Sequence, residues 1–177
     1  MTVGPAHATG APTGESEAST ALAVLAEHSL TLATAESLTG GLIGELLTSV
    51  PGASRSYLGG VISYATRLKH TLAGVPSATL DELGPVAAQT AAAMALGVAE
   101  RCEADWGLAV TGVAGPDPQD GHPVGQVFVG VARAATGWST VRELELGGDR
   151  GAIRRQTAVA ALVLLAEAVR DSASAST

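Results

Sequence analysis

The feature that most constrains the fold is residues 31–49, TLATAESLTGGLIGELLTS, where a short apolar run leads through a Gly-Gly turn into an amphipathic segment. The run Thr31–Ala35 is typical of a buried strand, and the apolar residues after Thr39 recur at helical spacing. A hydroxyl at such a turn lies at the open end of a sheet, near backbone N–H groups without intrahelical partners. A capping Ser37 or Thr39 without chemistry explains the same pattern, so this stretch alone leaves both interpretations open.

The rest of the chain predicts one α/β domain. Its 177 residues suffice for a single sizeable core, and with 46% hydrophobic but only 3% aromatic residues that core is built from small aliphatic side chains. Such a core suits helices packed on a sheet. We expect a disordered tail over 1–14, the domain over 15–171 and a frayed C-terminus over 172–177.

Hydrophobic periodicity places the elements along the chain. Strands are predicted over 31–35, 59–64, 106–110, 126–134 and 138–146, the last two forming a hairpin. Helices are predicted over 16–28, after Thr39 up to Pro51, and over 66–72, 85–102 and 151–169. The connector 76–84 is expected to hold a single helical turn at 80–83.

Charge and composition exclude several classes of function. A net charge of −7 with ten basic residues offers no general attraction for nucleic acid. No apolar run is long enough to cross a membrane and no signal peptide is visible, so we expect a cytoplasmic protein. The single cysteine, Cys102, falls in an apolar helical pattern and is expected to be a buried thiol.

The basic residues are distributed unevenly between the two types. Nine of the ten are arginine, and the only lysine is Lys69. Chance explains one remaining lysine, but so does a need for an amine that can lose its proton, which arginine cannot do.

Other candidate residues also follow strands or open helices. Tyr64 is expected to end a strand just before the helix that carries Lys69. A third strand runs into Thr111, Gly112 and Gly115, a turn that can present N–H groups and a hydroxyl to an anion or an amide. Arg150 and Arg154 lie in the first turns of the last helix, where positive charge opposes the helix dipole unless an anion binds; solvated arginines are the alternative.

The residue types present allow few kinds of catalytic site. The four histidines and one cysteine are scattered without ligand spacing, so we expect no metal and no cofactor, and no Ser-His-Asp set is evident. Ser37, Tyr64 and Lys69 remain. A serine can be activated by a neutral lysine, or by a tyrosine whose pKa a nearby ammonium lowers. Backbone N–H groups after Thr39, in the turn of Gly40 and Gly41, would hold the oxyanion.

Five motifs in order resemble the CinA C-terminal domain family, the nicotinamide-nucleotide amidohydrolases or NMN deamidases. They are AESLTGG at 35–41, GVISY at 60–64 with Lys69, TGVAGP at 111–116, PVGQV at 123–127, and GDR at 148–150 with Ile153-Arg154. The resemblance covers about 22–169. It implies a three-layer α/β/α domain with a mixed sheet, here in stand-alone form, and a homo-oligomer.

The resemblance also implies an activity and roles for residues. The protein would hydrolyse the carboxamide of nicotinamide mononucleotide, releasing ammonia and nicotinic acid mononucleotide for NAD recycling. The family's serine nucleophile corresponds to Ser37, and the tyrosine and lysine that assist it correspond to Tyr64 and Lys69. Thr111 and Arg150 fall on substrate or phosphate contacts. There are two departures: Leu38, in place of a frequent cysteine, is adjacent to the nucleophile and leaves the serine in place, and a shorter loop after Pro116 bears on substrate fit.

Two other interpretations compete. One is a non-catalytic or differently specific nucleotide-binding relative with the same pocket. The other is a short-chain dehydrogenase, which we disfavour because the spacing from Tyr64 to Lys69 is one residue too long and no Gly-rich cofactor turn stands near the N-terminus.

Overall fold

The computed structural model describes residues 14–174. Residues 1–13 of the predicted tail 1–14, and residues 175–177, lie outside the described residues. The strands are β1 Leu32–Glu36, β2 Tyr57–Ile62, β3 Trp106–Gly112, β4 Gln126–Arg133 and β5 Trp138–Glu145. The α-helices are α1 Glu15–Glu27, α2 Leu42–Thr48, α3 Thr66–Thr71, α4 Ser77–Leu83, α5 Ala88–Arg101 and α6 Arg150–Ser174, with short 3₁₀ turns at Ala53–Arg55 and Ala134–Thr136.

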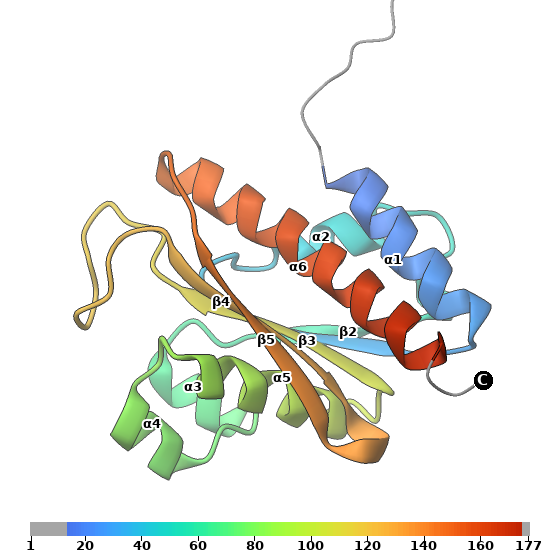
Figure 1. Cartoon of the computed structure of the whole chain (residues 1–177), viewed down its shortest axis with the longest axis horizontal. Coiled ribbons are helices and arrows are strands. Elements are labelled where there is room, and N and C mark those ends of the chain that lie inside the picture. Colours follow the sequence, from blue (N-terminus) through green and yellow to red (C-terminus); the bar gives the residue numbers. More distant parts are fainter. Residues whose placement is uncertain (1–13, 175–177) are drawn as a thin grey trace, which may run out of the picture.

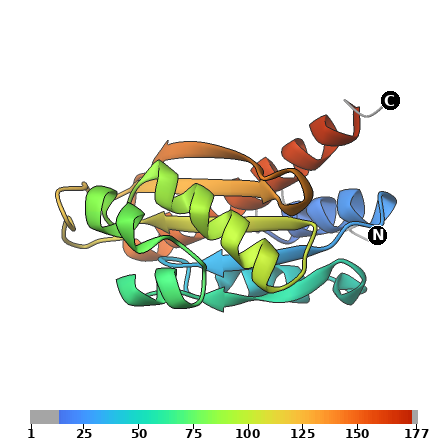
Figure 2. The same ribbon diagram turned by 90° about the horizontal axis from the view of Figure 1, so that it is seen from below.

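One mixed sheet lies between two layers of helices, as predicted. Its strand order is β2-β1-β3-β4-β5, and Figure 2 looks onto the face of this sheet that α3, α4 and α5 cover. β1 pairs in parallel with β2 and β3, whereas the β3–β4 and β4–β5 pairs are antiparallel. Helices α1, α2 and α6 cover one face, and α3, α4 and α5 lie on the other (Figure 1). The carboxyl ends of β1, β2 and β3 therefore meet at one end of the sheet, where α/β proteins bind ligands.

The core follows the small-residue composition. The larger apolar cluster fills the space under α1, α2 and α6, and a second, alanine-rich cluster packs α5 against β1 and β3. Close approach needs glycine in the central strands: a Cβ on Gly60 of β2 would collide with Thr34 of β1, and one on Gly107 of β3 would collide with the Ala95 carbonyl of α5. The central strands thus lie close enough to carry their end residues into one site.

Several predicted boundaries were wrong. The second strand is Tyr57–Ile62 instead of 59–64, because backbone pairing with β1 already begins where the Leu32 N–H donates to the Ser56 carbonyl at 2.8 Å. Tyr64 therefore lies beyond the strand. The connector 76–84 contains the helix α4, the helix predicted from 85 begins at Ala88, and α6 continues to Ser174, so residues 172–174 are helical and not frayed.

Candidate active site

Ser37 lies at the carboxyl end of β1, the strand between β2 and β3. It is 7% exposed, and its backbone N–H donates to the Val110 carbonyl of β3 at 3.2 Å. The chain then turns through Gly40 and Gly41, whose φ angles of 60° and 102° are left-handed and suit glycine. This turn brings the chain into α2 and leaves the serine at the end of the sheet.

Lys69 reaches Ser37 from α3. Its Nζ donates to the Ser37 Oγ at 2.8 Å and to the Ser63 carbonyl at 3.1 Å, and the side chain is 2% exposed. No carboxylate forms an ion pair with it in the part of the chain that the structure describes. Burial lowers the pKa of Lys69 from 10.5 to about 8. The amine next to the serine can therefore lose its proton near neutral pH.

The N-terminus of α2 does not offer the anion site expected there. The buried Glu36 carboxylate accepts hydrogen bonds from the N–H groups of Gly41 and Gly44, each at 2.9 Å, and of Ile43 at 3.1 Å. An internal carboxylate thus occupies the place that helix N-termini offer to anions. The prediction that Gly40 and Gly41 bind substrate through this helix end has no support from the geometry.

Two backbone donors stay available nearer the serine. Among the described residues, the N–H groups of Leu38 and Thr39 have no hydrogen-bond acceptor. They follow Ser37 directly, which is where a donor must lie to meet an oxyanion formed by attack of that serine. The Thr39 hydroxyl is completely buried and also lacks a partner there.

Arg150 and Tyr64 form the rim of the site. The Arg150 guanidinium donates to the Tyr64 hydroxyl at 3.0 Å and to the Gly115 carbonyl at 2.8 Å. Tyr64 is 60% exposed. Because the Ser37–Lys69 pair forms without it, the structure places Tyr64 beside the pair and not within it.

The remaining predicted residues divide into lining and supporting groups. Thr111 and Gly112 line the cavity, and the Thr111 hydroxyl donates to the Pro85 carbonyl at 2.6 Å. Arg154 does not line it. Its guanidinium donates to the carbonyls of Leu38 and Thr39.

The cavity at Ser37 is small and polar. It measures about 90 Å³, against roughly 300–1,000 Å³ for typical small-molecule sites. Sequence reasoning missed several of its lining residues, namely Thr66, Pro85, Val86 and Gln119. Gln119 comes from the loop after Pro116, where a Gln119–His122 bridge folds the chain back on itself. A pocket of this size fits the reacting end of a ligand, with the remainder lying across the rim.

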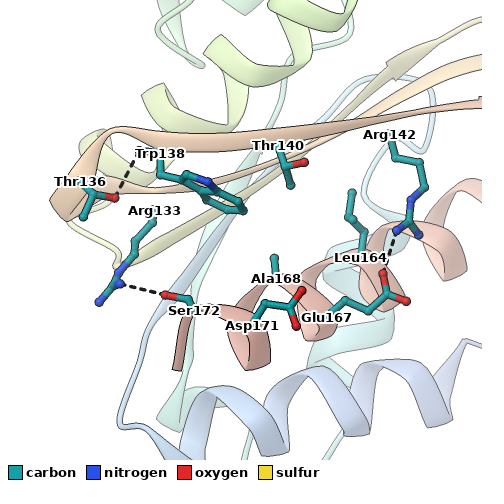
Figure 3. A pocket seen from close by; sticks show the side chains of 10 residues that line it. All are labelled: Arg133, Thr136, Trp138, Thr140, Arg142, Leu164, Glu167, Ala168, Asp171 and Ser172. Atoms are coloured by element: carbon teal, nitrogen blue, oxygen red, sulfur yellow. Dashed lines mark hydrogen bonds and ion pairs between the residues drawn. The ribbon is translucent and has the colours of Figure 1, made fainter. Parts of the chain in front are cut away.

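A larger hollow of about 610 Å³ lies between β5 and the second half of α6 (Figure 3). Three of its charged side chains are engaged with neighbours: Arg142 pairs with Glu167 at 2.8 Å, and Arg133 donates to Ser172 at 2.9 Å. The Trp138 ring packs edge-on against Trp106. The hollow contains neither Ser37 nor Lys69, so its size does not make it the candidate active site.

Two negative findings apply to residues 14–174. No group of three or more His, Cys, Asp or Glu side chains there is arranged to hold a metal ion. None of the helices in that range combines the length and the apolar character that crossing a membrane requires.

The chain is similar in sequence to known proteins. The CinA C-terminal domain family matches residues 15–169. A CinA-like protein of Frankia casuarinae is 48% identical over 144 residues, 81% of this chain and 33% of its own length. A CinA-like protein of Acidobacterium capsulatum is 44% identical over 150 residues, 84% of this chain and 36% of its own. The chain thus spans about a third of the length of these curated relatives.

Solved structures agree. The competence/damage inducible protein CihA of Agrobacterium tumefaciens superposes with a TM-score of 0.83 at 33% identity, covering 96% of this chain and 99% of that one. A competence-damaged protein (CinA) superfamily protein of Klebsiella pneumoniae gives a TM-score of 0.86 at 25% identity, covering 90% and 99%.

Proposed function

The chain belongs to the CinA C-terminal domain family, and from this premise we propose that it hydrolyses the carboxamide of nicotinamide mononucleotide. The products are ammonia and nicotinic acid mononucleotide. The observation that carries the proposal is the buried Ser37–Lys69 pair, with Nζ 2.8 Å from Oγ and burial holding the pKa of the lysine near 8. A serine beside a neutral amine is a nucleophile with its general base.

The geometry supports a two-step acyl transfer. The Ser37 Oγ attacks the carboxamide carbon while Lys69 Nζ takes the hydroxyl proton. The oxyanion meets the N–H groups of Leu38 and Thr39. Lys69 then returns the proton to the departing nitrogen, and ammonia leaves an ester on Ser37. Water attacks that ester, Lys69 again takes the proton, and breakdown releases the carboxylate and restores the serine.

The rim suits the nucleotide part of the substrate. Arg150 uses two of its five N–H donors on Gly115 and Tyr64 and keeps the others for a phosphate. Tyr64 and Gln119 line the same opening. Since the cavity of about 90 Å³ is too small for a whole nucleotide, the carboxamide enters it and the phosphate stays outside, on Arg150.

The test is ammonia release from nicotinamide mononucleotide by the parent protein, with Ser37→Ala as the inactive variant. Ser54→Ala is the matched control, because Ser54 is exposed and outside the cavity. The parent and Ser54→Ala should release ammonia with or without EDTA, and Ser37→Ala should bind the nucleotide without turnover. Binding without turnover by the parent itself would favour the competing proposal, a non-catalytic or differently specific nucleotide-binding relative.

Three accompanying expectations stay predictions: a homo-oligomer, a cytoplasmic location, and no nucleic-acid or membrane partner. Light scattering on the purified protein and fractionation of cells would test the first two.

A further inference from the structure

Arg154 holds the turn that carries Ser37. From the second turn of α6, its Nε donates to the Leu38 carbonyl at 3.1 Å and its Nη2 donates to the Thr39 carbonyl at 2.6 Å. These are the two residues that directly follow the serine. A planar guanidinium that bonds two consecutive carbonyls fixes both the distance and the orientation of their peptide groups.

Glu36 holds the same turn from the opposite side. Its carboxylate accepts three backbone N–H groups at the start of α2, and it is 2% exposed. The turn is thus held by an anion on its donor side and a cation on its acceptor side. Neither side chain lines the cavity at Ser37, so both act on the turn and not on a ligand in that cavity.

The position of the turn decides the alignment of Ser37 with Lys69. Lys69 is fixed on its own side by the Ser63 carbonyl at 3.1 Å, so its Nζ does not simply follow the serine. The 2.8 Å separation of Nζ and Oγ is short enough for proton transfer. A displacement of about 1 Å at reacting groups can cost on the order of 100-fold in rate.

We propose that Arg154 is a positioning residue that keeps the Ser37 hydroxyl aligned on Lys69 by holding the Leu38 and Thr39 carbonyls, and that it does not contact the substrate. This inference rests on the proposed function in assigning Ser37 as nucleophile. It replaces the prediction that Arg154 binds the nucleotide. The Leu38 carbonyl shares its peptide group with the Thr39 N–H, one of the two candidate oxyanion donors, so Arg154 orients that donor too.

The experiment compares Arg154→Gln with Arg154→Lys and with the control Arg155→Gln. Arg155 is adjacent, of the same type and exposed. The first measurement is the rate at which a small alkyl fluorophosphonate labels Ser37 with loss of fluoride, because this reports on the nucleophile without nucleotide contacts. The second is kcat and KM for nicotinamide mononucleotide. Thermal melting shows which variants are folded at the assay temperature.

The labelling rate and kcat of Arg154→Gln should both fall by about 10- to 100-fold, with KM within about twofold of the parent. Arg154→Lys should recover part of both, because one ammonium can still donate to these carbonyls. Arg155→Gln should match the parent. If Arg154→Gln does not fold, Arg154→Lys carries the same comparison.

Two results overturn the inference. One is a raised KM with an unchanged labelling rate, which makes Arg154 a substrate contact. The other is a parent serine that the fluorophosphonate does not label, since there is then no activated nucleophile to align. A parent that is labelled but releases no ammonia refutes the proposed function instead, and the labelling rates still decide the role of Arg154.

Discussion

Replacing Lys69 with arginine should abolish activity while the protein still binds the nucleotide. The general base must be neutral when it takes the serine proton, and burial lowers the pKa of Lys69 to about 8. From this pKa, about a tenth of the molecules hold a neutral amine at pH 7 and about nine tenths at pH 9. The parent kcat should therefore rise by about tenfold between these pH values and level off above them.

Arginine at position 69 keeps the positive charge but cannot act as a general base. A positioned general base contributes roughly 10²- to 10⁴-fold to a rate, so Lys69→Arg should lose that factor at every pH. The double variant with Ser37→Ala should be little worse than either single variant, because the two residues act as a unit. Arg67→Lys is the matched control, the reverse exchange at an exposed position of the same helix, α3.

The assay is ammonia release at saturating nucleotide across the pH range, with nucleotide binding measured separately for each variant. The reasoning fails if Lys69→Arg keeps most of kcat, or if the parent kcat is flat between pH 7 and pH 9. Lys69 would then be an electrostatic support, and Tyr64 or water would be the likelier base.

The remaining predictions concern Arg150 and stability. Arg150→Ala should raise KM for nicotinamide mononucleotide by about tenfold or more, because a charge-assisted contact of about 1.5–3 kcal/mol is lost. Nicotinamide riboside is the phosphate-free comparison. Equal KM values in the variant and the parent would make Arg150 a surface residue. Lys69→Met should stabilise the inactive protein at pH 7, because lowering the lysine pKa from 10.5 to about 8 costs the folded state about 3 kcal/mol. The parent should gain stability as pH rises from 8 to 10.5, because in this range the unfolded chain holds a proton on Lys69 that the folded chain has lost. The Lys69→Met variant should lack this gain. Urea titrations at pH 7 and pH 9.5 measure the free energy of unfolding of the parent and of the variant.

The sequence was most informative where residues lie at the ends of adjacent strands. Ser37 ends β1 and Lys69 follows β2, and since these strands pair in parallel their ends meet, so their convergence could be predicted. The α/β class was predicted from the alternation of strands and helices, and the three layers with a mixed sheet were predicted from the resemblance to the CinA C-terminal domain family. Boundaries were harder: β2 begins at Tyr57 because its backbone pairing with β1 starts opposite Leu32, and the periodicity of β2 does not reveal that register.

The roles of charged side chains could not be predicted from their positions. Arg150 and Arg154 are one helical turn apart, which suggested one shared ligand, yet Arg150 faces the rim and Arg154 bonds the Ser37 turn. No sequence pattern around Glu36 indicates that its carboxylate accepts hydrogen bonds from the start of α2. Gln119 lies in a loop whose path depends on local bridges, and so it was missed.

The placement of Glu36 also explains how Lys69 keeps a low pKa. Consecutive strand residues point to opposite faces of a sheet, so Glu36 turns toward α2 while Ser37 turns toward α3. A carboxylate next to Lys69 would favour its charged form and raise its pKa, and the amine could not act as a base near neutral pH. By binding its carboxylate to the start of α2, the chain keeps an acid adjacent in sequence to the nucleophile away from the lysine. The free energy spent on burying an amine without a counter-ion, about 3 kcal/mol, is therefore the physical condition for its proposed chemistry.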